Sequence, residues 1–152
     1  MSDDLVQRAK DLAHRAHAGQ VDKAGKPYIE HVARVAGAVS DDPFAEAVAW
    51  LHDVIEDTAG DEQNRIGHHI EDSFPAAVVN AVLALTRFEG YPEGNYYADI
   101  REDEIALRVK LADIADNSDE LRLTLLGEET AERLRRKYAR AIQALKGADG
   151  ER

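Results

Sequence analysis

The segment from Phe44 to Asp57 constrains the fold of this chain more than any other. Its first part, residues 44–51, is apolar on nearly every side, and a helix of that kind is normally buried. The segment then closes with one histidine and three carboxylates: His52, Asp53, Glu56 and Asp57. Burying unpaired charges costs free energy, so buried charged groups are normally paired or bound to a metal. The segment therefore predicts a buried helix that carries a metal site, with an acid/base pair one turn further on.

The remainder of the chain has the pattern of successive helices separated by loops with glycine and proline. Asp42 and Pro43 are a clear start signal, because Asp is a good N-cap and Pro fits the first helical position. No segment alternates like a strand for more than a few residues. We therefore expect an all-α fold and a single domain over residues 1–152, with its core at about 5–146. The expected helices cover residues 5–18, 28–39, 43–56, 62–72, 75–86, 96–100, 104–116 and 128–145.

The composition excludes several kinds of site and partner. The chain contains no cysteine, which excludes disulfides, thiolate zinc sites and a cysteine nucleophile, so any metal must be bound by His, Asp or Glu. The net charge is −11, and the longest basic run is Arg135-Arg136-Lys137 on an expected solvated helix face. A nucleic acid partner is therefore disfavoured. A small anionic substrate still fits if a metal and a few local Lys or Arg residues neutralise it.

Membrane insertion and secretion are not expected. The chain has no run of about 18 apolar residues, and its N-terminus, Met1 to Asp4, is acidic. These features argue against a membrane span and a signal peptide, and they make the cytoplasm the expected location.

Two further residues could complete a metal site with His52 and Asp53. Asp113 lies among apolar residues of the expected helix 104–116, and His31 lies on a helix with an apolar face. Either one alone is more often a structural residue than a ligand. As a set, two imidazoles and two carboxylates suit Mn, Fe or Zn and leave coordination positions for water and substrate. The spacing between these residues is too long for any local rule to establish the site.

Glu56 and Asp57 follow His52 and Asp53 by four residues. Because residues four apart share a helix face, we expect Glu56 to stack over His52 and Asp57 over Asp53. A carboxylate near water at a metal can position that water, take its proton or protonate the leaving group. The alternative is a solvent-exposed helix end, although acids are unfavourable at the C-terminus of a helix.

The spaced order of His31, His52-Asp53 and Asp113 resembles the HD superfamily of metal-dependent phosphohydrolases. The likeness is closer to the hydrolase domain of the RelA/SpoT proteins and their small single-domain relatives. The segments that carry this likeness span roughly residues 12–120 and occur in the order of that group: Ala16 to Gln20, Gly25 to His31, Leu51 to Thr58, Asn95-Tyr96, and Val109 to Asp113 with Asn117 after it.

This resemblance implies an HD-type helical bundle that holds one divalent metal, usually manganese. It implies that the metal ligands are His31, His52, Asp53 and Asp113, that the catalytic acids are Glu56 and Asp57, and that Tyr96 and Asn117 contact the nucleotide. The reaction of the family is hydrolysis of the 3′-diphosphate of guanosine tetra- and pentaphosphate, which gives GDP or GTP and pyrophosphate.

The chain departs from the family pattern where the substrate would be recognised. The base-contacting loop usually reads Arg-Lys-Ser-Gly-Glu-Pro-Tyr, and here Asp22 replaces the arginine and Ala24 the serine. After Asp113 the family often has Arg-Leu-His-Asn-Met-Arg-Thr, whereas this chain has Ile-Ala-Asp-Asn-Ser-Asp-Glu, with Asp119 and Glu120 in place of the Arg and Thr. Base and phosphate specificity therefore stay open. Positive charges near the site could replace the missing ones, and Lys23 is the best candidate because loops carry specificity.

Three functional hypotheses follow. The first is a manganese-dependent pyrophosphohydrolase of guanosine 3′-diphosphate alarmones. The second is an HD-type phosphatase of another nucleotide, which the changed recognition residues favour. The third is a nucleotide-binding domain that does no chemistry. The final expected helix carries a stripe that either closes the bundle or forms a homodimer contact: Leu134, Tyr138, Ala141 and Leu145.

Overall fold

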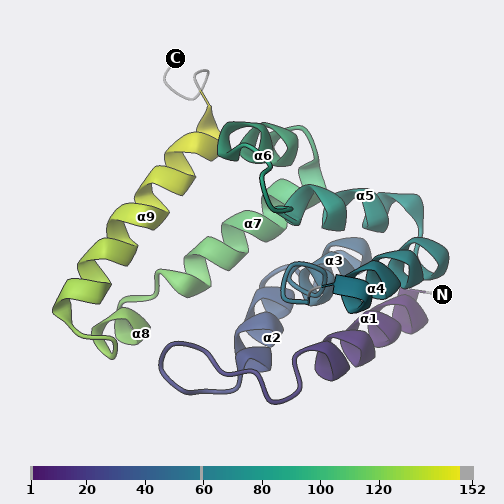
Figure 1. Cartoon of the computed structure of the whole chain (residues 1–152), viewed down its shortest axis with the longest axis horizontal. Coiled ribbons are helices and arrows are strands. Elements are labelled where there is room, and N and C mark those ends of the chain that lie inside the picture. Colours follow the sequence, from purple (N-terminus) through teal and green to yellow (C-terminus); the bar gives the residue numbers. More distant parts are fainter. Residues whose placement is uncertain (1, 59, 148–152) are drawn as a thin grey trace.

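The computed structural model describes residues 2–58 and 60–147 of the chain. Within these residues the regular secondary structure is helical (Figure 1). An isolated β-bridge pairs Val21 with Pro27. The prediction of an all-α fold is confirmed. The helices are α1 (Ser2–Ala16), α2 (Tyr28–Ala38), α3 (Pro43–Leu51), α4 (Gly60–Ser73), α5 (Ala76–Leu85), α6 (Glu93–Arg101), α7 (Glu104–Asn117), α8 (Glu120–Thr124) and α9 (Glu128–Lys146).

Helix α3 lies in the middle of the bundle and packs against α1, α2, α5 and α7. It begins as expected, since the side chain of Asp42 accepts hydrogen bonds from the N–H groups of Phe44 and Ala45, and Pro43 takes the first helical position. Every residue from Ala47 to Leu51 is buried. A helix that is apolar all round has thus become the centre of the core.

The C-terminal end of α3 differs from the prediction. The helix stops at Leu51 instead of Glu56, and His52 to Asp57 lie in turns. The buried imidazole of His52 donates from Nδ1 to the carbonyl of Ala49 at 2.6 Å, and this hydrogen bond satisfies an acceptor of the last helical turn. Glu56 and Asp57 therefore do not extend the buried helix, and they lie at the surface beyond its end.

Short or proline-flanked helices were the other places where the prediction was wrong. Helix α8 was not expected. Helix α6 begins at Glu93, inside a stretch that the sequence assigned to a loop, because Pro92 directly precedes its first turn. The other helix boundaries lie within a few residues of those expected.

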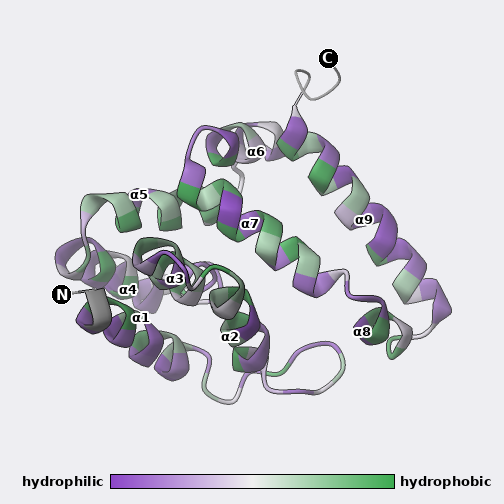
Figure 2. Cartoon of the chain, turned by 180° about the vertical axis from the view of Figure 1, so that it is seen from behind, coloured by the Kyte–Doolittle hydropathy of each residue, from purple (hydrophilic) through white to green (hydrophobic). Residues whose placement is uncertain are grey.

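Helix α9 lies along α6, α7 and α8 (Figure 1). Three residues of its stripe are buried in the chain itself, and Tyr138 is half-buried. Ala141 and Leu145 join the main core, and Leu134 joins a small cluster with Leu123 and Ala131. Figure 2 shows α9 as a largely hydrophilic helix, in contrast to the hydrophobic α5. The bundle itself therefore buries most of the stripe. No helix in the described part of the chain is long and apolar enough to cross a bilayer.

Candidate metal centre and adjoining pocket

The structure brings His31, His52, Asp53 and Asp113 together from two helices and from the turn that follows a third. His31 comes from the first turn of α2, the His52-Asp53 pair from the end of α3, and Asp113 from α7. Each offers one nitrogen or oxygen atom, and these four atoms all lie within 4.8 Å of one another. His31, His52 and Asp113 are buried, and Asp53 is half-buried. Residues separated by up to 82 positions in the sequence thus form one cluster.

Both imidazoles point the same nitrogen into this cluster. That nitrogen is Nε2, because Nδ1 is already hydrogen-bonded in both residues. The Nδ1 atom of His52 donates to the carbonyl of Ala49, and that of His31 donates to the carboxylate of Asp116 at 2.7 Å. The Nε2 atom of His52 is buried without a hydrogen-bond partner, 3.1 Å from Asp53 Oδ2. A buried polar atom without a partner is costly, and a bound cation would satisfy it. The donor set therefore fits a divalent metal.

The two carboxylates of the cluster are held in ionised form. Burial alone would raise the pKa of Asp113, but the imidazoles of His31 and His52 beside its carboxylate keep that pKa well below its usual range. Burial opposes ionisation of Asp53 too, and the charge of His52 nevertheless lowers its pKa. Ionised carboxylates are the form that binds a metal.

Neighbouring side chains fix the direction of these carboxylates. The hydroxyl of Tyr28 donates to Asp53 Oδ2. Lys110 Nζ lies 3.3 Å from Asp113 Oδ2, and Asn117 Nδ2 donates to Asp113 Oδ1 at 3.2 Å. Such partners orient the ligands of a metal site.

Glu56 and Asp57 lie beside the cluster and are held by other parts of the chain. Glu56 Oε1 accepts a hydrogen bond from the backbone N–H of Arg87 at 2.7 Å, and Asp57 Oδ2 accepts one from Gln20 Nε2 at 3.1 Å. Partial burial raises the pKa of both carboxyl groups, and the negative charge of Asp53 adds to each rise. Carboxyl groups with raised pKa values next to a candidate metal centre are suited to proton transfer.

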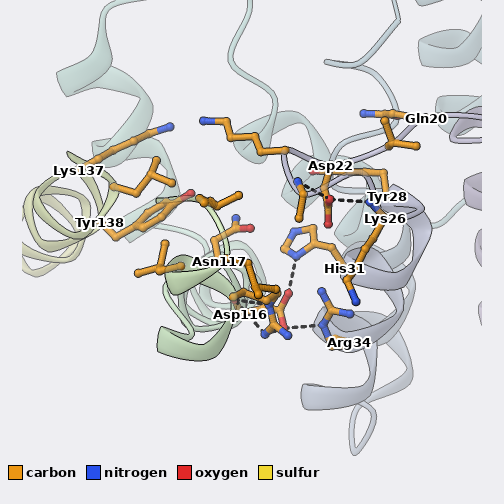
Figure 3. A pocket seen from close by; sticks show the side chains of 18 residues that line it. Gln20, Asp22, Lys26, Tyr28, His31, Arg34, Asp116, Asn117, Lys137 and Tyr138 are labelled. Carbon is orange, nitrogen blue, oxygen red and sulfur yellow. Dashed lines mark hydrogen bonds and ion pairs between the residues drawn. The ribbon is translucent and has the colours of Figure 1, made fainter. Parts of the chain in front are cut away.

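A cavity of about 320 Å³ adjoins the cluster at His31 (Figure 3). One wall consists of the loop from Gln20 to Lys26 together with Tyr28, and the opposite wall comes from α8, α9 and the turn between them. The opposite wall is largely apolar, with Leu123, Leu125, Leu126, Leu134 and Tyr138. Lysine side chains from both sides also line the cavity: Lys23, Lys26 and Lys137. A cavity with an apolar wall and cationic lining suits an anionic ligand with a hydrophobic part.

The residues expected to contact a nucleotide lie in two places. Lys23 and Asn117 line the cavity. Tyr96 is buried, its hydroxyl lies 3.4 Å from the carbonyl of Leu85, and its ring lies 5.6 Å from the ammonium of Lys110. Tyr96 is therefore connected to the cluster through Lys110, which pairs with Asp113.

Asp22, which stands where the family pattern has arginine, organises its own loop. Its Oδ1 atom accepts hydrogen bonds from the backbone N–H groups of Ala24 and Lys26, both at 2.9 Å. This is the local turn chemistry that Asp favours. The carboxylate shapes the loop that carries Lys23.

The two acids after Asn117 also have structural partners. Asp119 caps α8 by accepting from the N–H of Leu121 at 2.8 Å, and it lies 3.1 Å from Arg122. Glu120 pairs with Arg135 of α9 at 2.8 Å. These acids hold α8 and α9 in position, and so they shape the apolar wall of the cavity.

Sequence reasoning did not identify Asp116, Arg34, Arg122 or Lys137 as members of the site. Asp116 was noted only as part of a departure from the family pattern, although it lies one turn after Asp113 and so on a similar face. That spacing was the signal that could have found it. Lys137 was assigned to a solvated face because its basic run looked like ordinary surface charge.

Comparisons with known proteins agree with this fold. No family model matches the chain. The chain is 28% identical over 142 residues to a protein from Myxococcus xanthus named GTP pyrophosphokinase. This match covers 86% of this chain and 19% of that protein. The chain is 32% identical over 124 residues to a Synechocystis protein named probable guanosine-3′,5′-bis(diphosphate) 3′-pyrophosphohydrolase, covering 74% of this chain and 16% of that protein. The chain thus spans less than a fifth of these relatives.

A solved structure shares the fold over nearly the whole chain. It belongs to a metazoan ortholog of SpoT that is described as hydrolysing ppGpp, and it superimposes with a TM-score of 0.75 at 23% identity. The match covers 94% of this chain and 86% of that one. The fold and the His31, His52, Asp53 and Asp113 cluster define an HD-type helical domain. Among such domains, this one is RelA/SpoT hydrolase-like.

Proposed function

We propose that this protein is a metal-dependent hydrolase of guanosine 3′,5′-bis(diphosphate) that releases the 3′-diphosphate as pyrophosphate. The observation that carries the proposal is the buried cluster of two imidazoles and two ionised carboxylates beside a cationic cavity. The names of the relatives, which include 3′-pyrophosphohydrolases, support the choice of substrate. The cytoplasm, where such a nucleotide would be met, is the proposed location.

His31, His52, Asp53 and Asp113 are the proposed metal ligands, and manganese is the proposed metal. A divalent ion bound there would lower the pKa of water and offset charge on the phosphoryl oxygens. The unpartnered Nε2 of His52 supports this assignment. Tyr28 and Lys110 contribute by fixing the carboxylates of Asp53 and Asp113.

Glu56 and Asp57 are the proposed catalytic acids. Their carboxyl groups are anchored by Arg87 and Gln20 and lie outside the cluster of four donors. From that position they would orient the attacking water and take its proton. Their raised pKa values support this role, because a proton acceptor works best when its pKa approaches the working pH.

The cavity is the proposed nucleotide site. The apolar wall from α8 and α9 suits the nucleoside, and Lys23 and Asn117 are the proposed contacts to its charged and polar groups. Tyr96 is kept as a proposed contact through its place beside Lys110. Phosphoryl transfer needs mainly positioning and electrostatic stabilisation, which this arrangement supports.

A second candidate function is hydrolysis of a phosphate from another nucleotide by the same residues. Asp22 favours it, because that carboxylate is engaged with its own loop where the family pattern has an arginine for guanine. A third candidate, nucleotide binding without chemistry, is disfavoured by the presence of both the donor cluster and the two acids.

Turnover of guanosine tetraphosphate by the purified protein with added manganese tests the proposal. Pyrophosphate and orthophosphate are measured separately, and Glu56→Gln is the control. Pyrophosphate release by the wild type but not by the variant supports the proposed function. Orthophosphate release, or no release from a metal-loaded protein, contradicts it and favours the second candidate.

A further inference from the structure

The imidazole of His31 lies between two carboxylates of the same helix. Its Nε2 atom lies 2.9 Å from Asp113 Oδ1, inside the cluster. Its Nδ1 atom lies 2.7 Å from Asp116 Oδ2, outside the cluster (Figure 3). The contact with Asp116 is largely shielded from water, since the side chains of His31 and Asp116 are only 4% and 11% exposed. Asp113 and Asp116 stand one turn apart on α7, so the two contacts share one rigid element.

Two arginines from different helices hold Asp116 in place. Arg34 of α2 donates from Nε to Asp116 Oδ1 at 2.8 Å, and Arg122 of α8 donates to the same oxygen at 2.6 Å. Arg122 also donates to the backbone carbonyl of Asp116. One oxygen of the Asp116 carboxylate thus accepts hydrogen bonds from the two arginines, and the other accepts one from His31. Asp116 cannot turn away from the imidazole without breaking these bonds.

The two histidines of the cluster therefore have different partners behind them. His52 has a neutral partner, the carbonyl of Ala49, whereas His31 has the carboxylate of Asp116. A carboxylate that accepts the Nδ1 proton fixes the tautomer with a lone pair on Nε2 and raises the basicity of that nitrogen. The two imidazoles are therefore oriented by different partners, and only His31 depends on a side chain for its orientation.

We propose that Asp116 is a positioning residue of the metal centre, which directs His31 Nε2 toward the ion and is itself held by Arg34 and Arg122. The inference rests on the proposed metal centre and goes beyond its four ligands. Asp116 is the third residue after Asp113 in the sequence. Asp116 therefore gives this chain a carboxylate–histidine–metal arrangement that depends on its own sequence.

The first test is the affinity of the full chain for Mn²⁺ and for Zn²⁺, each added alone and measured by competition with a chelating dye. Asp116→Ala should weaken binding by about 10- to 100-fold, the usual effect of losing such a partner. Asp41→Asn is the matched control, because Asp41 pairs with Arg108 and contacts neither His31 nor the two arginines that hold Asp116. Its affinity should equal that of the wild type.

The second test observes the proton that the proposal invokes. In the Zn²⁺-loaded wild type, the Nδ1 proton of His31 should give a downfield, slowly exchanging NMR signal, because it is shared with a buried carboxylate. Asp116→Asn, which keeps the side-chain volume, should move this signal upfield and speed its exchange. This variant carries the test if Asp116→Ala does not fold.

The outcomes distinguish failure of the proposed metal centre from failure of the proposed role of Asp116. A wild type that binds neither metal contradicts the proposed metal centre, and the inference falls with it. A wild type that binds metal, together with Asp116 variants of unchanged affinity and an unchanged Nδ1 signal, overturns the inference alone and leaves the proposed function standing.

Discussion

The carboxylate of Glu56 accepts a hydrogen bond of 2.7 Å from the backbone N–H of Arg87, which follows α5. This bond fixes a surface carboxylate near the cluster without using any of the four candidate ligands. Glutamine can accept the same bond through its carbonyl oxygen but cannot take a proton from water. The pair therefore allows the chemistry of Glu56 to be removed while its position is kept.

Glu56→Gln should abolish turnover and leave metal binding unchanged. The loss in kcat should be about 10²- to 10⁴-fold, the range expected for a positioned acid or base. Metal content by elemental analysis and initial rates with manganese check this expectation. Glu62→Gln is the matched control, because Glu62 lies on α4 and pairs with Arg65. Unchanged turnover in Glu56→Gln would remove Glu56 from the mechanism.

The raised pKa of Glu56 predicts that this residue destabilises the fold at neutral pH. A carboxyl group whose pKa is higher in the folded state than in the unfolded state favours unfolding when it is ionised. The loss in the free energy of unfolding is complete above the folded-state pKa of Glu56. It disappears as the pH falls through that pKa toward the ordinary pKa of a glutamate. Glu56→Gln should thus raise the Tm of the chelator-treated protein at pH 7, and the gain should vanish at acid pH. A gain of equal size at every pH would contradict the assignment.

Loss of a candidate ligand should remove the stabilisation that a metal provides. A ligand that binds only the folded state at a hundred times its Kd adds about 2.7 kcal/mol to the free energy of unfolding. Asp53→Ala should therefore lose metal, and its Tm should no longer rise when manganese is added. Thermal melts of wild type and variant, with manganese and with a chelator, measure this. Full metal occupancy in Asp53→Ala would rule out Asp53 as a ligand.

Lys23 tests the role of the cavity. It is exposed on the loop that Asp22 organises, and it lines the cavity next to the cluster. If Lys23 only binds the nucleotide, Lys23→Ala should raise KM more than it lowers kcat. Lys146→Ala, on the last turn of α9, is a control of equal charge change. A fall in kcat at constant KM would instead assign Lys23 to the chemical step.

The parts of the fold that the sequence could predict are those with a strong local pattern. The interior of α3 was predicted because a helix that is apolar on nearly every side is normally buried in the core. Its start was predicted from Asp42 and Pro43. Its end was not predicted, because the stop depends on where the side chain of His52 finds an acceptor. Helix α8 was missed because five residues are too few to show a period.

Some residues of the candidate site were likewise predicted from the sequence, and others were not. The four donors were proposed through a family resemblance, since no spacing rule links His31 to Asp113, and the structure brings them together. Asp116 was not predicted, because its spacing from Asp113 indicates only a shared helix face and a lone acid near a helix end usually faces water. Only the packing of α2, α7 and α8 shows that it lies between His31 and two arginines.

The apolar wall of the cavity has an evolutionary consequence. The four candidate metal ligands come from α2, α7 and the end of α3, whereas the wall comes from residues between Leu123 and Tyr138. Substitutions in that later segment can reshape the space offered to a nucleobase while every donor to the metal stays in place. Proteins that descend from such a chain could therefore change their nucleotide substrate while they keep the same candidate metal ligands.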